Sequence, residues 1–517
     1  MHLRPLLTMA QQSPRGRSGS FWRIFSSSRN RQAGSEESLI RSHMAQPNQQ
    51  TAAAAVPTGP EKLAAVTSLM DKLAEDLTSI SLLPHQRDSA LEELKIYSRD
   101  PRDADPLFTK KGIETLARHA FNSPSSTTSR NAMRILCNAL LLKQETRQML
   151  VDLGYEAKLC DKLKSDNRDD EFLVSRILFL TTYGTTVNLK ELIDKHHLAD
   201  AIIKNLERHA KQRSVTSSAT DPMEDTALSQ TLQLLFNITH YCGDRASSFT
   251  AAIPHIVTVL CKGSFSTQRP LDPPTSSLVN ALLNLEIGSK DVRSSLYPQN
   301  DPNMLANRLV DLLSRSMAAY KDEELDGSIT PLIGVIRAIH EHAPEDVKNS
   351  IRSRLLPTEA DRSQVLGRTD SLPSWLLKNS TNPLAPQLRE TISNLFFDMS
   401  DKDASKFVEN VGYGFASGFL FNRNLPIPQN ASEAFSTAQG GPNRPVNPIT
   451  GQFLDNERHP ETPEMTQEEK EREAERLFVL FERLRANGVI SAENPVRTAV
   501  EQGRFEELPD DYEEELD

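Results

Sequence analysis

The sequence predicts an all-α protein: an armadillo/HEAT-like superhelical solenoid, followed by a C-terminal linker and an extra amphipathic helix. Three observations predict this fold. From about Pro60, apolar residues recur at three- and four-residue spacing, which is the period of an amphipathic helix. Alternating β-branched runs joined by Asn-Gly turns are nearly absent, so a sheet has little support. Similar helical segments also recur along the chain, as they do in repeat proteins.

The repetition is clearest in segments that place an asparagine after a short apolar run. They are RNAMRILCNALL (130–141), SQTLQLLFNITH (229–240), SSLVNALLNLEI (276–287) and QLRETISNLFFD (387–398), which carry Asn138, Asn237, Asn284 and Asn394. Two similar segments, 173–184 and 329–340, fill the gaps and carry Leu180 and Arg337 at that position. Asn138 and Leu180 lie 42 residues apart, close to the armadillo/HEAT period. One such unit cannot bury its apolar stripe alone, so we expect the units to stack and form a concave face.

The recurring asparagine has two interpretations. Asparagine is a poor residue inside a helix, because its side chain competes for backbone hydrogen bonds. Its recurrence therefore favours a ladder of amides on one surface, where donors and acceptors could hold the backbone of a bound peptide. The alternative is that each asparagine only bonds to a neighbouring loop.

Composition divides the chain into five parts. The arm is rich in Ser and Arg and poor in acidic residues, which predicts disorder, with an organelle signal as the alternative. The linker is rich in Pro, Asn and Gly, and the tail is acidic, so the tail is also expected to be disordered. The predicted parts are a basic arm (1–56), the solenoid (57–425), the linker (426–465), the C-terminal helix (466–490) and the tail (491–517).

The predicted C-terminal helix has clear start and stop signals. Thr466 and Glu469 form a capping box, and Asn487-Gly488 ends the helix. Its apolar stripe includes Leu477, Phe478, Phe481 and Leu484. This stripe either packs back on the solenoid as a cap or binds a partner.

Composition and motifs exclude several classes of protein. The net charge of −11 argues against general nucleic-acid binding, and no apolar run is long enough for a transmembrane helix. None of the four cysteines forms a CxxC pair, so free thiols in a reducing compartment are expected. There is no GxxxxGK[ST], GxSxG or HExxH motif. The sequence therefore predicts a binding protein with no catalytic residue, metal or cofactor.

Several segments resemble the synembryn family, known for resistance to inhibitors of cholinesterase. Residues 91–121 (LEELKIYSRDPRDADPLFTKKGIETLARHAF) resemble its second helical unit, and LLFNITH (234–240) resembles its LFNxT helix. FVENVGYGFASGFLFNRNL (407–425) resembles its TGYGNAAGLLA segment. NPITGQ (447–452) and the segment 463–490, which contains MTQEEKEREA, resemble its NPxTG and MTEEQKEHEA motifs. These motifs occur in the family's order, so the chain is identified as a fungal-type member.

The resemblance implies a non-receptor guanine nucleotide exchange factor and folding chaperone for the α subunits of heterotrimeric G proteins (Gα). Such proteins bind GDP-loaded Gα, take its C-terminal helix into the concave face and stabilise the nucleotide-free state. The resemblance also implies a cytoplasmic location, including the cytoplasmic face of the plasma membrane through Gα. The alternative is an armadillo-type scaffold or transport adaptor. Import adaptors pair each groove asparagine with a tryptophan, whereas this chain has only Trp22 and Trp375.

The resemblance also implies which residues contact Gα. Lys95 and Arg99 match a basic pair, and their i, i+4 spacing would place both on one helix face, ready for the terminal carboxylate of Gα. The alternative for this pair is ordinary surface charge. The expected groove contacts are Asn138 and Asn237, which match family positions, and Asn284, which is inferred from the ladder alone. A second contact is expected from the stripe of the C-terminal helix, Leu477, Phe478, Phe481 and Leu484.

Overall fold

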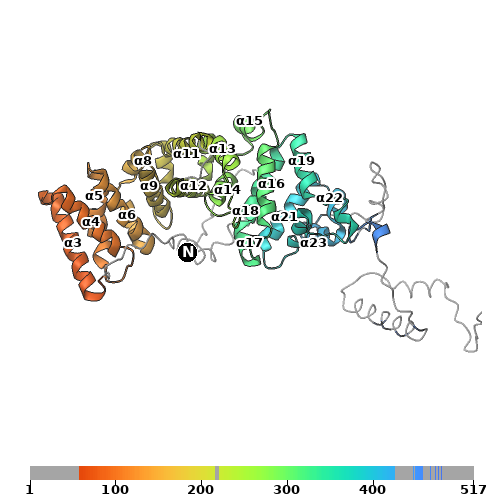
Figure 1. Ribbon diagram of the computed structural model, residues 1–517, viewed down its shortest axis with the longest axis horizontal. Coiled ribbons are helices and arrows are strands. Elements are labelled where there is room, and N and C mark those ends of the chain that lie inside the picture. Colours follow the sequence, from red (N-terminus) through yellow and green to blue (C-terminus); the bar gives the residue numbers. More distant parts are fainter. Residues whose placement is uncertain are drawn as a thin grey trace, which may run out of the picture. The chain divides into compact units, whose positions relative to one another are not determined.

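The computed structural model describes residues 57–215, 221–425, 446–447 and 449–457, and the single positions 466, 472, 476 and 479. Two compact units are distinguished, Met1–Leu454 and Asp455–Asp517. Every helix from α3 to α23 belongs to the first unit (Figure 1). Within the described ranges there is no β-strand, and one isolated bridge joins Val446 to Phe453. The predicted all-α class is therefore confirmed.

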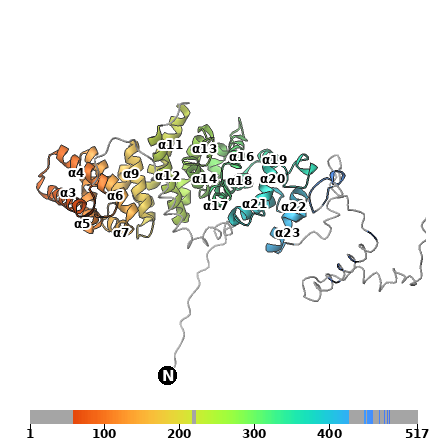
Figure 2. The same cartoon turned by 60° about the horizontal axis from the view of Figure 1, so that its bottom comes forward.

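Seven helices pack side by side in chain order and form a first row (Figure 2). They are α4 (Pro84–Tyr97), α6 (Ser126–Leu142), α9 (Arg168–Thr181), α12 (Pro222–Tyr241), α14 (Thr275–Leu283), α18 (Thr330–His342) and α21 (Pro386–Met399). All but α4 are the repeated segments of the sequence. Repetition in the sequence therefore identifies this row, and an armadillo/HEAT-like solenoid is the architecture that results.

A second row pairs with the first: α3 packs on α4, α5 on α6, α8 on α9, α11 on α12, α13 on α14 and α16 on α18. Its helices are α3 (Gly59–Ser79), α5 (Lys110–Asn122), α8 (Glu156–Leu163), α11 (Leu198–Val215), α13 (Ile253–Lys262), α16 (Met304–Ser316) and α19 (Glu345–Leu355). Shorter α-helices connect or end the rows: α7 (Glu145–Val151), α10 (Leu189–Asp194), α15 (Arg293–Leu296), α17 (Asp322–Ser328), α20 (Leu372–Asn379), α22 (Ala404–Val411) and α23 (Tyr413–Asn422). The 3-10 helices are η1 (Asp105–Phe108), η2 (Gly243–Ala252), η3 (Lys290–Val292), η4 (Asp361–Ser363) and η5 (Leu454–Asn456).

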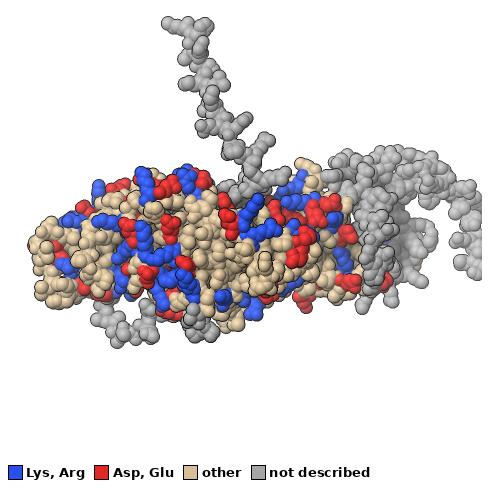
Figure 3. All heavy atoms as spheres, turned by 90° about the horizontal axis from the view of Figure 1, so that it is seen from above, with Lys and Arg blue, Asp and Glu red and all other residues tan. Residues whose placement is uncertain are grey.

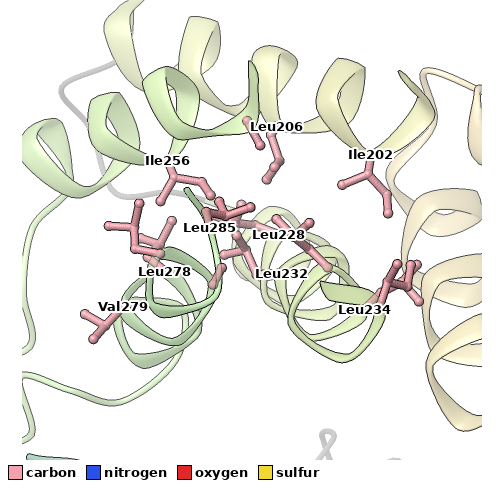
Figure 4. Close-up of a cluster of buried hydrophobic side chains, with 14 of the residues drawn as sticks. Ile202, Leu206, Leu228, Leu232, Leu234, Ile256, Leu278, Val279 and Leu285 are labelled. Atoms are coloured by element: carbon pink, nitrogen blue, oxygen red, sulfur yellow. The ribbon is translucent and has the colours of Figure 1, made fainter. Parts of the chain in front are cut away.

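The core lies between the two rows. In the middle of the array, Leu228 and Leu232 of α12 meet Leu206 of α11, Ile256 of α13 and Leu278 of α14 (Figure 4). All five are buried, and burying a side chain of this kind contributes roughly 1.5–3 kcal/mol. Because each helix covers residues of its neighbours, the core is continuous from unit to unit.

Charged side chains of both signs lie on the surface. On the face that Figure 3 presents, basic and acidic side chains are interspersed, as is usual for a solvated surface. Over the described residues, no helix combines the length and the apolar character needed to cross a lipid bilayer.

Part of the predicted linker differs from the expectation. Residues 449–453 do not simply lead away from the solenoid, because the backbone of Phe453 and Thr450 bonds to the segment that precedes α20. The arm (1–56), the tail (491–517) and the stripe of the C-terminal helix, Leu477, Phe478, Phe481 and Leu484, lie outside the described residues. The boundaries of the five parts stay predictions.

A buried charged cluster joins the two rows. His209 of α11 lies between two carboxylates of the first row, with Nε2 3.0 Å from Glu171 Oε1 and Nδ1 2.5 Å from Glu224 Oε1. All three side chains are at most 2% exposed. Arg208 pairs with Glu171, and Arg168 pairs with Glu224. A buried carboxylate is costly unless it is paired, so this cluster fixes how α11 sits on α9 and α12.

Two members of the cluster, His209 and Glu224, have shifted pKa values. Burial alone would lower the pKa of His209, but its contacts with Glu171 and Glu224 outweigh burial and raise that pKa above 6.5. Burial alone would raise the pKa of Glu224, but His209 and Arg168 lower it below 4.5. The imidazolium and the carboxylate are therefore the favoured forms in the folded protein.

We predict that His209→Gln lowers the free energy of unfolding by roughly 3 kcal/mol near pH 6, because it removes one partner of a buried ion pair. The contribution of a raised histidine pKa is complete below about 6.5 and is lost as the pH rises through the folded value. The difference between wild type and variant, measured by urea denaturation, should therefore shrink toward pH 9.

The matched control is Lys211→Ala, which removes an exposed pair with Glu207 on the same helix. Exposed pairs contribute roughly 0–1 kcal/mol, so this control should change little at any pH. A His209→Gln variant as stable as the control would contradict the role given to the cluster.

Candidate binding groove

A candidate site is a pocket of about 390 Å³ on the first row, formed by α9, α12 and α14 with one residue of α6. Its lining residues are Leu141, Phe172, Arg176, Phe179, Leu180, Tyr183, Thr226, Ser229, Gln230, Leu232, Gln233, Phe236, Asn237, Pro273, Ser276, Ser277 and Asn280. We call this pocket the groove. It spans three successive units, so no single repeat contains it.

Helical spacing explains why these side chains share one surface. Phe172, Arg176 and Phe179 recur at four and three residues along α9, which places them on one face. Gln233 and Asn237 do the same on α12. Because α9 and α12 pack against each other, the two stripes become neighbouring walls of one groove.

The groove is rich in half-buried aromatic rings. Phe172, Phe179, Tyr183 and Phe236 are each partly exposed. The rings of Phe179 and Tyr183 meet edge to face, with centroids 5.2 Å apart. Aromatic side chains carry a large apolar surface, so a ligand that covers these rings gains from burying what is left exposed.

The polar side chains of the groove are amides, hydroxyls and one cation. Arg176 lies with its guanidinium carbon 5.7 Å from the centre of the Phe172 ring, and its Nη1 donates to Gln230 Oε1 at 3.4 Å. It forms no ion pair with any residue that the structure describes, and none of the lining residues is acidic. Such a surface suits an amphipathic segment that carries a carboxylate.

Three of the four recurring asparagines bond to the preceding helix of the row or to the turn just beyond it, whereas the amide of Asn394 donates to the Glu390 carbonyl of its own helix. Asn138 Nδ2 donates to Ser98 Oγ at 2.8 Å, just beyond α4. Asn237 Nδ2 donates to Thr182 Oγ1 at 2.8 Å, and its Oδ1 accepts from Tyr183 at 3.3 Å, both just beyond α9. These amides therefore connect successive units.

Asn284 follows the same rule, since its Nδ2 donates to the backbone carbonyl of Phe236 on α12 at 3.1 Å. The bonds favour the second interpretation of the repeated asparagine, in which it holds a neighbouring segment. Asn237 alone of the three lines the groove, and both ends of its amide are already engaged. A contact of Asn138, Asn237 or Asn284 with Gα stays a prediction.

The basic pair is placed differently from the expectation. Helix α4 ends at Tyr97, and Arg99 lies in the turn that follows, so the two cations do not share one helix face. In this turn the Ser98 hydroxyl donates to the Lys95 carbonyl at 2.8 Å, and Pro101 follows, which disfavours a helical conformation at the residue before it. Lys95 pairs with Glu92. Arg99 is exposed and has no ion-pair partner among the described residues.

Sequence reasoning missed the aromatic residues and Arg176. The sequence did hold a pattern that could have found Arg176. Four residues before the shared asparagine position, four successive units carry a long polar side chain or an amide: Arg134, Arg176, Gln233 and Asn280. One helical turn separates the two positions, so both belong to the same face. Arg134 pairs with Asp169 at 2.9 Å, which leaves Arg176 as the cation of the groove.

The metal-ligating side chains and the thiols of the described part of the chain form no second candidate site. His, Cys, Asp and Glu side chains there do not gather in groups of three or more that could hold a metal ion. The four cysteines are free, and burial raises the pKa of Cys137 to about 12 and that of Cys261 to about 11. Thiols of this kind are poor nucleophiles.

Fold and groove together define an armadillo/HEAT-like helical repeat protein whose candidate site is a binding surface. The chain belongs to the family of the guanine nucleotide exchange factor synembryn, whose model matches residues 90–504. A synembryn-like chaperone of Schizosaccharomyces pombe is 26% identical over 403 residues, which cover 72% of this chain and 75% of that protein. The chaperone Ric-8A of Macaca fascicularis is 25% identical over 464 residues, with coverages of 81% and 85%.

The chain is also similar to solved structures of engineered repeat proteins. A designed armadillo repeat protein is 15% identical, has a TM-score of 0.35 and covers 52% of this chain and 99% of its own. An engineered protein with a TM-score of 0.40 is 15% identical and covers 72% of this chain and 85% of its own.

We predict that Asn237→Ala lowers the free energy of unfolding by roughly 1–3 kcal/mol, because Thr182 and Tyr183 lose their buried partner. Asn138→Ala is the matched comparison: the residue is only partly buried and makes one bond, so its loss should be smaller. Urea denaturation of both variants measures the difference. Unchanged stability of Asn237→Ala would instead favour an amide kept free for a ligand.

Proposed function

We propose that this protein is a non-receptor guanine nucleotide exchange factor and folding chaperone for Gα, and that it binds the C-terminal helix of Gα in the groove. The observation that carries the proposal is the match of residues 90–504 to the synembryn exchange-factor family. The relatives named as chaperones support the chaperone part. The groove supplies a surface of suitable chemistry.

The groove suits an amphipathic helix. A helix laid in a groove binds through apolar residues at i, i+3, i+4 and i+7, and the half-exposed rings of Phe179, Tyr183 and Phe236 offer matching apolar contacts. Each well-buried apolar side chain of the ligand contributes roughly 1.5–3 kcal/mol before ordering costs. Arg176 and, toward the start of the row, Arg99 are cations without an ion-pair partner in the described chain that can receive the ligand's carboxylates.

Exchange then follows from differential affinity. A protein that binds empty Gα more tightly than GDP-loaded Gα shifts the population toward the empty state and so releases GDP. The same preference stabilises a Gα chain before it holds nucleotide, which is a chaperone effect. No covalent step takes place on this protein, and the site of action is the cytoplasm and its membrane face, where Gα lies.

We predict that the purified protein accelerates GDP release from a full-length Gα and binds no guanine nucleotide itself. Release is followed with a fluorescent GDP analogue, and nucleotide binding by equilibrium dialysis. The control is the same Gα without its C-terminal residues, which should respond much less because it cannot fill the groove. Equal acceleration of both Gα forms would contradict binding through the groove.

We predict that the double reversal Lys95→Glu and Arg99→Glu weakens Gα binding by about 2 kcal/mol or more if the two cations meet a partly buried carboxylate. Fluorescence anisotropy with a labelled Gα tail peptide measures the loss. The matched control is Lys290→Glu with Arg293→Glu, an equal charge change at exposed positions beside α13 of the second row. If both double variants bind alike, Lys95 and Arg99 are ordinary surface charge.

A further inference from the structure

The NPITG motif lies at the C-terminal end of the helical array. Residues 449–453 follow α23 in the chain, yet their backbone bonds to segments that precede α23. Thr450 accepts from Leu366 N at 3.1 Å, and Phe453 N donates to the carbonyl of Arg362 at 2.9 Å. Phe453 is buried at 6% exposure. The motif is therefore packed as a structural element of the array.

The turn is preorganised by its own residues. The Asn447 side chain accepts from Ile449 N at 2.8 Å and from Thr450 N at 3.1 Å, and the Asn447 carbonyl accepts from Gly451 N at 2.8 Å. Gly451 has φ of +68°, which an L residue adopts only at a cost. A Cβ at Gly451 would also lie 2.3 Å from Leu366 Cδ1.

The turn supplies a backbone partner that the start of α23 lacks. A helix leaves its first N–H groups without intrahelical partners. In α23 one of these is Gly414 N, which donates to the carbonyl of Ile449 at 3.1 Å. The approach is close, because a Cβ on Gly412 would lie 3.3 Å from that same carbonyl oxygen.

Arg362 completes the junction on the side of α22. Its Nη2 donates to the carbonyls of Glu409 and Asn410, in the last turn of α22, at 2.9 and 3.0 Å. Its Nη1 donates to the carbonyl of Gly451 at 3.1 Å. A cation at a helix C-terminus is favoured by the helix dipole, so one guanidinium joins the end of α22 to the turn.

The loop that carries Arg362 is itself held by Asp361. The buried carboxylate of Asp361 accepts from Thr358 N at 2.9 Å and from Thr369 Oγ1 at 2.7 Å. Burial alone would raise the pKa of Asp361, but hydrogen bonds from Ser371, Thr358 and Thr369 lower it. The loop that presents Arg362 is thus held by hydrogen bonds to a buried carboxylate.

We propose that residues 446–447 and 449–453 are a clasp, which caps the start of α23 through Ile449 and holds Arg362 at the end of α22 through Gly451, and so closes the array at its C-terminal end. The last two helices, α22 and α23, depend on a segment that follows them in the chain. The clasp also fixes where the chain beyond Phe453 begins. The functional part of this inference rests on the proposed function. Activity on intact Gα should need the clasp, whereas binding of the isolated Gα tail peptide should not.

Hydrogen–deuterium exchange on the full-length protein tests the structural part. In Gly451→Ala, amides of residues 358–371 and 412–416 should exchange roughly tenfold faster, because a strained left-handed position opens the turn. Ile449→Ala is the matched control, since that side chain is 63% exposed and only its backbone bonds. Amides of α9 and α12 should be unchanged in both variants, which shows that the array has stayed folded. Unchanged exchange over 358–371 and 412–416 in Gly451→Ala would overturn the clasp.

A second variant, Arg362→Lys, keeps the charge and removes the forked geometry that reaches three carbonyls. It should also speed exchange over 404–416. In the functional arm, Gly451→Ala and Arg362→Lys should bind the Gα tail peptide like wild type and release GDP from intact Gα several-fold more slowly. Full GDP-release rates in variants whose clasp has opened would overturn the link to activity. A wild-type protein inactive on Gα would overturn the proposed function, while the hydrogen-exchange arm would still decide the clasp.

Discussion

The structure depends on one constraint: a pair of helices in the array from α3 to α23 cannot cover its own apolar face. Leu228 and Leu232 of α12 are buried against side chains of α11, α13 and α14 (Figure 4). Stability in such an array is a sum of unit terms and nearest-neighbour contacts. The contacts between neighbours are therefore where the sequence must be specific, and the polar residues buried there carry much of that specificity.

The recurring asparagine shows how one residue type serves those contacts. In α6, α12 and α14 its amide NH₂ reaches back to the preceding helix of the first row or the turn just beyond it, through Asn138, Asn237 and Asn284. These bonds set the distance between units. The positions one helical turn before the asparagine position take no part in these bonds. Two of them, Arg176 and Gln233, line the groove. The residues that join neighbouring units and the residues that line the groove therefore lie on the same helix face, one helical turn apart.

The sequence predicted the helices, the row of repeated segments and the class of fold, because a helical period and a repeat are local signals. It did not predict which polar side chains remain available. The basic pair Lys95 and Arg99 seemed to share a helix face, but the Ser98 hydroxyl bonds back to Lys95 and the helix ends at Tyr97. Likewise, the bond of Asn237 to Thr182 depends on how α9 and α12 pack. The first outcome is a local helix end that the spacing of the two cations does not reveal. The second depends on a contact between residues 55 positions apart, which no local pattern encodes.

The ends of a solenoid need a solution that its middle does not, because the terminal units lack a neighbour on one side. The first described helices leave Ile80 and Leu83 exposed at 80% and 58%. At the other end, three rings close the core: Phe397, Phe407 and Phe419 lie with centroids 5.4–5.6 Å apart. They seal the apolar side of the last helices but satisfy no backbone group. Unpaired helix ends cost free energy when water is excluded, and the carbonyl of Ile449 and the guanidinium of Arg362 supply the missing partners. A motif that looked like part of a linker is therefore explained by the same need for a neighbour that organises the rest of the array.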